Sequence, residues 1–146
     1  VEPMMTEQQF TAQSIEVLTA LASIMGHNYS PWIGFKGGKG IATTAGAITA
    51  MMPFGLVLLI LVWAIFTFTT KYVSVGSIAA AASLPILVIT GSAYHGKLAN
   101  GTWNKPLFIF SLIAAILAIW KHRANIARLK AGTENSIGQK KKEDSA

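Results

Sequence analysis

The chain contains apolar segments that are too long and too continuous for the surface of a soluble domain. The longest runs from Ile41 to Thr70 and is interrupted at Pro53, and two more follow at about 73–90 and 107–120. A helix needs about 20 predominantly apolar residues to cross the hydrocarbon core of a bilayer. These segments therefore predict an all-α fold, a polytopic bundle of transmembrane helices.

A proline in the longest apolar segment determines how often the chain crosses the membrane. Pro53 either kinks one long helix or separates two shorter ones, 41–52 and 54–70. Basic segments mark the cytoplasmic side, so the loop at 31–43 and the tail from Lys121 onward should share one side. An even number of crossings must then separate them. We therefore expect a break at Pro53 and about four membrane helices, together with part of a preceding helix.

The first helix after the loop is short for a membrane crossing. Residues 41–52 reach about 18 Å at 1.5 Å per residue, whereas the hydrocarbon core is about 30 Å thick. The helix is rich in Ala, Gly and Thr, which is typical of burial against other helices. The preceding helix is expected at 13–25, with Gly26 as its stop. Residues 1–139 are treated as one integral-membrane domain and 140–146 as a basic and acidic cytoplasmic tail.

Composition supports a membrane protein and excludes several kinds of site. Apolar residues make up 52% of the 146 residues and charged residues only 12%, against ~25% charged in soluble domains. Cysteine is absent, which excludes disulfides, a thiolate nucleophile and zinc–thiolate sites. The three histidines lack metal-ligand spacing. No metal site is therefore expected.

No carboxylate occurs between Val17 and Thr133, although nine lysines and arginines do. A site built from this window has no Asp or Glu to act as general base, nucleophile or magnesium ligand, unless the outer acids fold in. It has ample positive charge for an anionic substrate. A general scarcity of acids in membrane spans is a sufficient explanation for much of the window.

The loop before the longest apolar segment reads PWIGFKGGKGIAT from Pro31 to Thr43. Glycines let backbone N–H groups approach a ligand, lysines add positive charge, and the following helix N-terminus adds its dipole. These features suit a phosphate, although the string matches neither the Walker A nor the dinucleotide pattern. A phosphate cradle and an ordinary cytoplasmic turn whose lysines set the topology are equally good interpretations of these residues alone.

A second polar group, KHRANIARL, begins where the last apolar segment ends. On a continuing helix Lys121, His122, Asn125 and Arg128 share about a third of the circumference, with Leu129 interrupting the face. Such a face could bind phosphate oxygens while His122 donates a proton or a hydrogen bond. The alternative is a juxtamembrane basic anchor on anionic lipid, and the residues alone favour that alternative.

Two isolated polar residues are weaker candidates. His27 follows Gly26 and could orient a phosphate, but a histidine at a helix end is more often a cap. Ser77 lies about one turn into its apolar segment, where a serine usually bonds back to its own helix.

Four short motifs, taken together, are specific where each alone is modest. They are GH at 26–27, FKGGKGIAT at 35–43, KYVS at 71–74 and HRANIARLKAGTE at 122–134. Their order and spacing closely resemble the bacterial integral-membrane family of acyl-phosphate:glycerol-3-phosphate acyltransferases. The resemblance covers roughly residues 20 to 134.

The resemblance implies an enzyme that moves a fatty acyl group from acyl phosphate to the 1-hydroxyl of glycerol 3-phosphate. The products are lysophosphatidic acid and phosphate, in the first step of phospholipid synthesis. It also implies a multi-pass protein of the bacterial inner membrane, with the motifs and the C-terminus facing the cytoplasm, no cofactor and no nucleic-acid partner. By motif match the phosphate-binding residues are Gly37, Gly38 and Lys39, with Lys36, Arg128 and His27 as further candidates. The implied catalytic residues are Lys39, Ser77, His122 and Asn125.

The residues agree with this chemistry. Acyl phosphate is already activated, so the enzyme mainly has to hold two anionic substrates in line and neutralise charge as phosphate leaves. Lysines, arginine and backbone N–H groups can do so without a carboxylate base or a metal. The proton of the attacking hydroxyl would go to a substrate phosphate or to His122.

One family motif has no counterpart here. The family carries additional N-terminal membrane helices and an upstream GSGN motif, followed shortly by TN, that contributes to the same site. We therefore expect this chain to lack that N-terminal segment and to depend on it as a partner; a true short homologue would have to rebuild the missing wall. Two other classes stay open, an anion transporter and a non-catalytic membrane scaffold. A transporter of this kind predicts internal inverted repeats, and the sequence shows none.

Overall fold

The computed structural model describes residues 7–138, and every regular element within that range is helical. The elements are α1 (Glu7–Asn28), the short 3-10 helix η1 (Pro31–Ile33), α2 (Ile41–Met51), α3 (Pro53–Thr70), α4 (Val73–Tyr94), α5 (Lys105–Lys121) and α6 (Arg123–Lys130). The all-α prediction is confirmed. The predicted tail at 140–146 lies outside the described residues.

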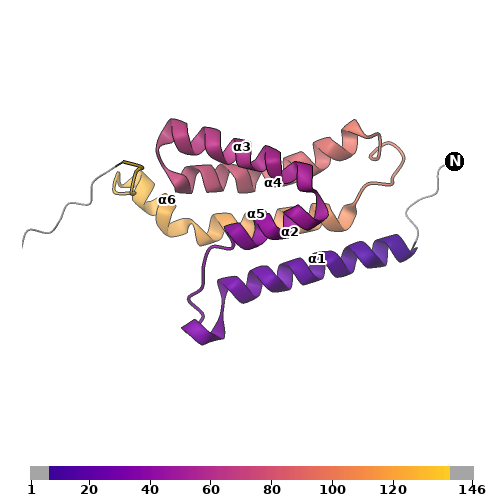
Figure 1. Cartoon of the computed structure of the whole chain (residues 1–146), viewed down its shortest axis with the longest axis horizontal. Helices are drawn as coiled ribbons and strands as arrows, with labels where there is room; N and C mark the ends of the chain where they lie inside the picture. The colour runs from indigo at the N-terminus through magenta and orange to yellow at the C-terminus, as the bar shows by residue number, and fades with distance from the viewer. Residues whose placement is uncertain (1–6, 139–146) are drawn as a thin grey trace, which may run out of the picture.

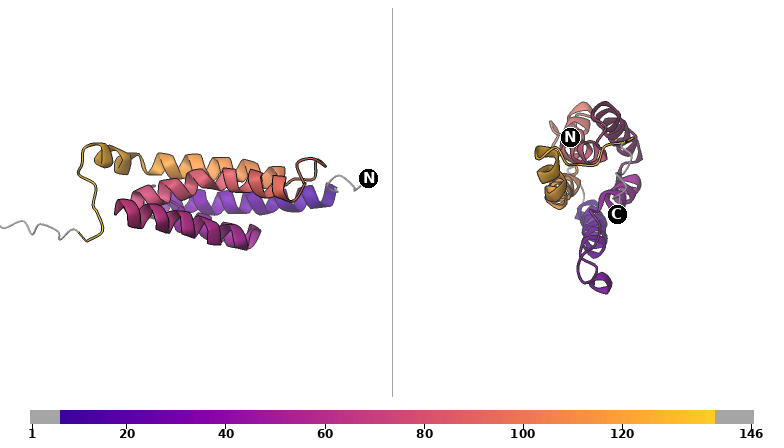
Figure 2. Two further views of the ribbon diagram at one scale, coloured as in Figure 1. Left: turned by 90° about the horizontal axis from the view of Figure 1, so that it is seen from above. Right: turned by 90° about the vertical axis from the view of Figure 1, so that its left-hand side faces the viewer.

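The long helices run side by side in one elongated bundle (Figures 1 and 2). One end of this bundle carries the α1–α2 loop, the α3–α4 turn and the α5–α6 junction, and therefore all four motifs. We call it the motif end. Ile24, Leu84 and Phe110 are almost fully buried in the core that joins α1, α4 and α5.

The break at Pro53 is present, as the sequence predicts. Met52 leaves the helical conformation with φ −154° and ψ 77°, and Pro53 starts α3. A proline is well placed there because the first residues of a helix need no intrahelical N–H donor. The longest apolar segment is therefore two helices joined by a sharp turn.

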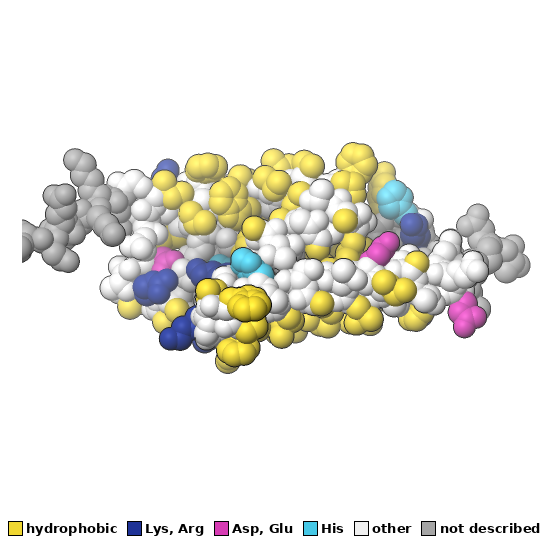
Figure 3. All heavy atoms as spheres, turned by 60° about the horizontal axis from the view of Figure 1, so that its bottom comes forward, with side chains coloured by type: hydrophobic (Ala, Val, Ile, Leu, Met, Phe, Trp, Pro, Cys, Tyr) yellow, Lys and Arg dark blue, Asp and Glu magenta, His cyan; other side chains and the backbone are white. Residues whose placement is uncertain are grey.

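Two helices, α3 and α4, are individually long and apolar enough to cross a membrane, and the bent pair α5–α6 counts as a third span if taken together. Helix α2 is apolar but has only 11 residues. Large apolar side chains of α3 face outward, with Phe54 87% exposed. Figure 3 shows apolar side chains over much of the middle of the molecule, with basic and histidine side chains nearer its ends. Lipid is the environment in which such a surface is favourable.

Two expected helix boundaries were wrong. Helix α1 does not stop at Gly26, because the hydrogen bond from Tyr29 N–H to Met25 O keeps the chain helical past it. The basic segment after Lys121 is not one continuing helix, because the axis bends by 51° between α5 and α6. In both places contacts with other segments, described below, outweigh the helix boundary that the local sequence favours.

Candidate active site

A polar pocket of about 490 Å³ lies at the motif end of the bundle. It is walled by the end of α1, the start of α2, the start of α4, the α5–α6 junction and the segment after α6. The lining residues are His27, Lys39, Gly40, Ile41, Ala42, Val73, Ser74, Ser77, His122, Asn125, Glu134 and Asn135. The fold thus brings five of the predicted site residues, His27, Lys39, Ser77, His122 and Asn125, to one pocket.

The glycine-rich loop is held by close packing against the end of α1. A Cβ on Gly37 would collide with the backbone carbonyl of His27, and a Cβ on Gly38 would collide with the His27 ring. Neither glycine lines the pocket, and Lys36 is exposed outside it. The two glycines therefore set the path of the loop that presents Lys39.

The first turn of α2 faces the pocket. Gly40 adopts the left-handed conformation with φ 76°, and the first intrahelical hydrogen bond runs from Thr44 N–H to its carbonyl. The preceding N–H groups, including those of the lining residues Ile41 and Ala42, have no acceptor within the helix. A helix N-terminus of this kind attracts anions.

A chain of side-chain contacts links the loop to α6. Lys39 Nζ donates to Asn125 Oδ1 at 2.6 Å, and Asn125 Nδ2 donates to Glu134 Oε1 at 2.6 Å. Arg128 Nε pairs with the other oxygen of Glu134 at 2.7 Å. Asn125 therefore acts as a bridge, and it fixes both the lysine and the carboxylate. Arg128 does not line the pocket and reaches it only through Glu134.

Glu134 is the site residue that sequence reasoning missed. It is one of the acids that lie outside the carboxylate-free window, and in the structure this outer acid folds into the site. Gly132, with φ 70°, reverses the chain after α6 in a Schellman motif: Gly132 N–H donates to Leu129 O and Thr133 N–H to Arg128 O. The signal was present in the sequence as a glycine two residues before a glutamate at the end of a basic helix.

The electrostatics of the network keep Glu134 ionised. Burial alone would raise the pKa of its carboxyl, but hydrogen bonds from Asn125 and Arg128 outweigh burial and hold that pKa below its usual value. Burial lowers the pKa of the Lys39 ammonium, the charge of Glu134 opposes this, and Arg128 adds to it. A carboxylate with a lowered pKa is a weak base, so Glu134 organises the site rather than abstracting a proton.

His122 occupies the bend between α5 and α6 and is only 2% exposed. Its Nδ1 lies 2.7 Å from Ala118 O. Because a carbonyl oxygen can only accept, Nδ1 must carry the proton of this hydrogen bond. The neutral ring then keeps an unprotonated Nε2, which is available to a ligand as an acceptor or base.

Ser77 sits where the polar pocket meets a second, apolar cavity. Its hydroxyl donates to Val73 O at 3.0 Å, as expected for a serine in an apolar helix, yet it is buried and lines both spaces. Ile41 is also shared by the two linings. Ser74, one turn earlier on α4, lines the polar pocket and was not predicted from the sequence.

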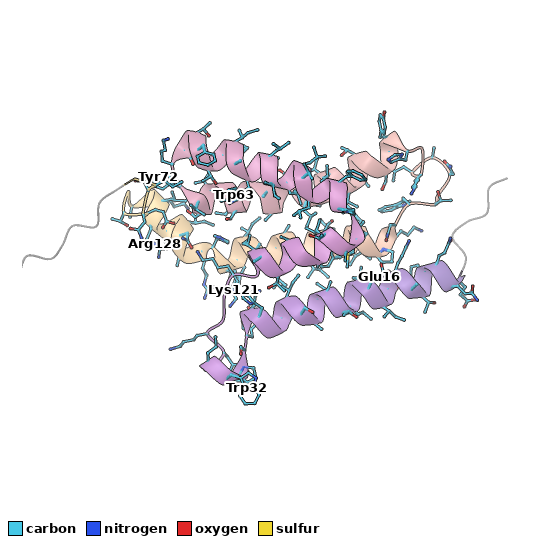
Figure 4. All side chains as sticks on the ribbon, viewed as in Figure 1. Glu16, Trp32, Trp63, Tyr72, Lys121 and Arg128 are labelled. Atoms are coloured by element: carbon cyan, nitrogen blue, oxygen red, sulfur yellow. The ribbon has the colours of Figure 1, made fainter. Side chains whose placement is uncertain are left out.

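Lys121 does not belong to the pocket face on which the continuing-helix model placed it. Its Nζ donates to Asn28 O at 2.7 Å and lies 4.1 Å from the centre of the Tyr29 ring. Figure 4 shows Lys121 nearer to α1 and Arg128 on α6. Lys121 therefore ties the end of α5 to the end of α1. Asn28 is fully buried beside Gly40, and its side-chain amide has no hydrogen-bond partner.

Replacing Gly37 with alanine should displace the loop and weaken ligand binding at the pocket by about tenfold or more, because the colliding atoms are backbone and cannot rotate away. Gly38→Ala should be milder, since the His27 ring can turn aside. The matched control is Gly26→Ala, where a Cβ meets nothing within 4 Å. Calorimetric titration with inorganic phosphate measures the series, and equal losses in all three variants would contradict this packing.

The Glu134 network should contribute to stability only above acid pH. Because the pKa of Glu134 is lower in the folded state than in the unfolded state, its contribution is complete above the ordinary glutamate pKa of 4.5 and is lost as pH falls through the lower, folded-state pKa. Melting temperatures of the wild type and Glu134→Gln should therefore differ at pH 7 and converge towards pH 3. A difference that grows in acid would contradict this sign.

Comparisons with known proteins agree on one family. The model of the family described as glycerol-3-phosphate acyltransferase matches residues 2–132. The glycerol-3-phosphate acyltransferase of Desulforamulus reducens is 44% identical over 97% of this chain and 66% of its own length. Glycerol-3-phosphate acyltransferase 2 of Moorella thermoacetica is 44% identical over 85% of this chain and 59% of its own length. The chain thus spans less than two thirds of these relatives.

Solved structures give the same result. Crystal structures of PlsY (YgiH), an integral membrane glycerol 3-phosphate acyltransferase, match with 33% identity in its glycerol 3-phosphate and lysophosphatidic acid forms. The TM-scores are 0.75 and 0.74, over 84% of this chain and 56% and 57% of PlsY. Sequence and fold therefore agree, and the chain belongs to the glycerol-3-phosphate acyltransferase family.

Proposed function

We propose that the polar pocket binds glycerol 3-phosphate and acyl phosphate and transfers the acyl group from the second to the first. The observation that carries this proposal is that the polar pocket adjoins the apolar cavity. A cationic pocket at a helix N-terminus suits phosphate, and the apolar cavity suits a fatty acyl chain. Ser77 and Ile41 line both spaces, so an acyl carbonyl at this boundary would lie beside the phosphate groups.

The apolar cavity has a lining suited to the start of an acyl chain. It measures about 200 Å³ and lies between α2, α3, α4 and α5. Apart from Ser77 and Thr44 its lining is apolar, with Ile48, Leu59 and Leu84 among its walls. A chain seated there would be removed from water while its phosphate stays in the polar pocket.

The proposed reaction needs no oxidant, metal or carboxylate base. The 1-hydroxyl oxygen of glycerol 3-phosphate attacks the acyl carbonyl carbon, an ester bond forms, and the bond from that carbon to the phosphate oxygen breaks. Inorganic phosphate leaves, and the hydroxyl proton passes to His122 Nε2. Lys39 and the first turn of α2 bind the phosphate charge, while Asn125 holds Lys39 in place. Arg128 does not contact the substrates itself and acts by holding Glu134 in place.

The surroundings of the reaction are also proposals. We place the motif end on the cytoplasmic side of the bacterial inner membrane, because the loop lysines and the basic residues from Lys121 onward lie at that end. On the family resemblance we further propose that a GSGN-type segment completes the pocket wall. Co-expression with the corresponding segment of a relative tests that requirement.

The direct test is acyl transfer in proteoliposomes. The chain, with and without the co-expressed GSGN-type segment, is supplied with palmitoyl phosphate and glycerol 3-phosphate. We expect lysophosphatidic acid and inorganic phosphate in equal amounts, with phosphate release dependent on glycerol 3-phosphate. Absence of lysophosphatidic acid under both conditions would overturn the proposed reaction.

A further inference from the structure

A second recess lies at the end of the bundle opposite the motif end. Helices α1 and α4 have 22 residues each, whereas α2 has 11 and α3 has 18. The α2–α3 turn therefore stops short of the bundle end and leaves a recess of about 430 Å³ above Met52 and Pro53. It shares no lining residue with the polar pocket at the motif end.

One part of the wall of this recess is polar and carries positive charge, and the rest is apolar. Lys97 and His95 come from the end of α4 and the loop after it, and Asn104 caps α5 by accepting from Leu107 N–H. Ser92 and Thr102 supply hydroxyl groups. No Asp or Glu is among the lining residues. The recess is therefore suited to a group with negative charge and several hydrogen-bonding atoms.

An unpartnered polar atom lies at the inner wall. Gln13 lines the recess from α1, and its amide oxygen is buried without a hydrogen-bond partner. Buried acceptors in folded proteins are normally paired. The terminal torsion of a glutamine is broad, so a small turn of the amide presents the oxygen to a donor in the recess. The missing partner is a donor such as a hydroxyl group.

An apolar groove continues from the recess along the outside of the bundle. Leu58 and Leu87 line both the recess and a smaller groove of about 160 Å³ between α3 and α4. Val62 and Ile86 extend this groove further along the two membrane-crossing helices. The groove therefore lies between two helices that are long and apolar enough to cross a membrane, where a lipid acyl chain can contact it.

We propose that the recess binds the headgroup of an anionic glycerophospholipid with free hydroxyl groups, with one acyl chain in the α3–α4 groove. Lys97 pairs with the phosphate, Gln13 accepts from a headgroup hydroxyl, and Leu58 and Leu87 contact the chain. Three separate observations meet at this place: positive charge, an unpartnered acceptor and a continuous apolar groove. This site is independent of the proposed acyl-transfer reaction.

Native mass spectrometry of the whole chain in detergent tests the site, with phosphatidylglycerol as the probe and phosphatidylcholine as the zwitterionic comparison. We expect phosphatidylglycerol to bind about tenfold more tightly, because its headgroup hydroxyls can donate to Gln13 and because Lys97 repels the choline cation of phosphatidylcholine. Lys97→Gln and Gln13→Leu should each remove most of this preference. The matched controls are Lys105→Gln and Gln8→Leu, exposed residues near the same end that do not line the recess.

Added inorganic phosphate separates a lipid site from a site for the free anion. We expect phosphate at millimolar concentration to change the affinity for phosphatidylglycerol by no more than about twofold, because inorganic phosphate has no acyl chain for the groove and no glycerol group that extends to Gln13. Equal binding of the two lipids would overturn the proposal, as would an equal loss in Lys105→Gln and Lys97→Gln. Complete displacement of phosphatidylglycerol by inorganic phosphate would also overturn it.

Discussion

Lys39→Met should weaken the binding of glycerol 3-phosphate by about 100-fold or more. The Lys39 ammonium has three N–H donors and uses one of them on Asn125 Oδ1 at 2.6 Å, which leaves two for a ligand in the pocket. Hydrogen bonds to charged groups contribute about 1.5–3 kcal/mol each, so the loss of two corresponds to at least two orders of magnitude. Methionine keeps a long unbranched side chain and removes the charge.

Lys36→Met is the matched control in the same loop. Lys36 is exposed and does not line the pocket. Its loss should weaken binding by about threefold or less, because it lowers only the long-range electrostatic attraction of the loop for an anion. Calorimetric titration of both variants in nanodiscs gives the comparison. Equal losses in the two variants would mean that the loop attracts the ligand by diffuse charge alone.

His122→Ala should lower the rate of acyl transfer by about 10² to 10⁴ while leaving the affinity for glycerol 3-phosphate within about threefold. The buried ring offers an unprotonated Nε2 to the pocket because its Nδ1–H donates to Ala118 O. Removing it takes away the proton acceptor but leaves Lys39 and the first turn of α2. Rates are measured as lysophosphatidic acid formed in proteoliposomes, and affinity by titration.

A second substitution separates the two roles open to His122. Glutamine in His122→Gln can form a hydrogen bond but cannot accept the proton, so we expect its rate to fall as far as that of His122→Ala. A rate within about tenfold of wild type would show that position 122 acts only through a hydrogen bond. Nearly full turnover in His122→Ala would remove this residue from the mechanism.

Much of the fold follows from local features of the sequence. The apolar segments and Pro53 determine the helices of residues 41–121, because apolar periodicity and a missing N–H act within a few residues. The family resemblance also identified five of the twelve residues that line the pocket: His27, Lys39, Ser77, His122 and Asn125. Their roles in substrate binding and catalysis stay predictions.

What the sequence did not reveal depends on contacts between distant segments. Helical periodicity places Lys121 on the basic face of its own helix, yet its Nζ donates to the carbonyl of Asn28, 93 positions earlier. Glu134 lies beyond the end of α6, and only the reversal of the chain at Gly132 returns it to Asn125. Periodicity along one helix contains no information about either contact.

A structure determined with glycerol 3-phosphate bound tests the central claim most directly. We predict the phosphate in the polar pocket, with one oxygen about 3 Å from Lys39 Nζ and others facing the first turn of α2. The 1-hydroxyl should point toward His122 Nε2 and the boundary marked by Ser77. A phosphate bound elsewhere, or a glycerol hydroxyl turned away from that boundary, would contradict the account.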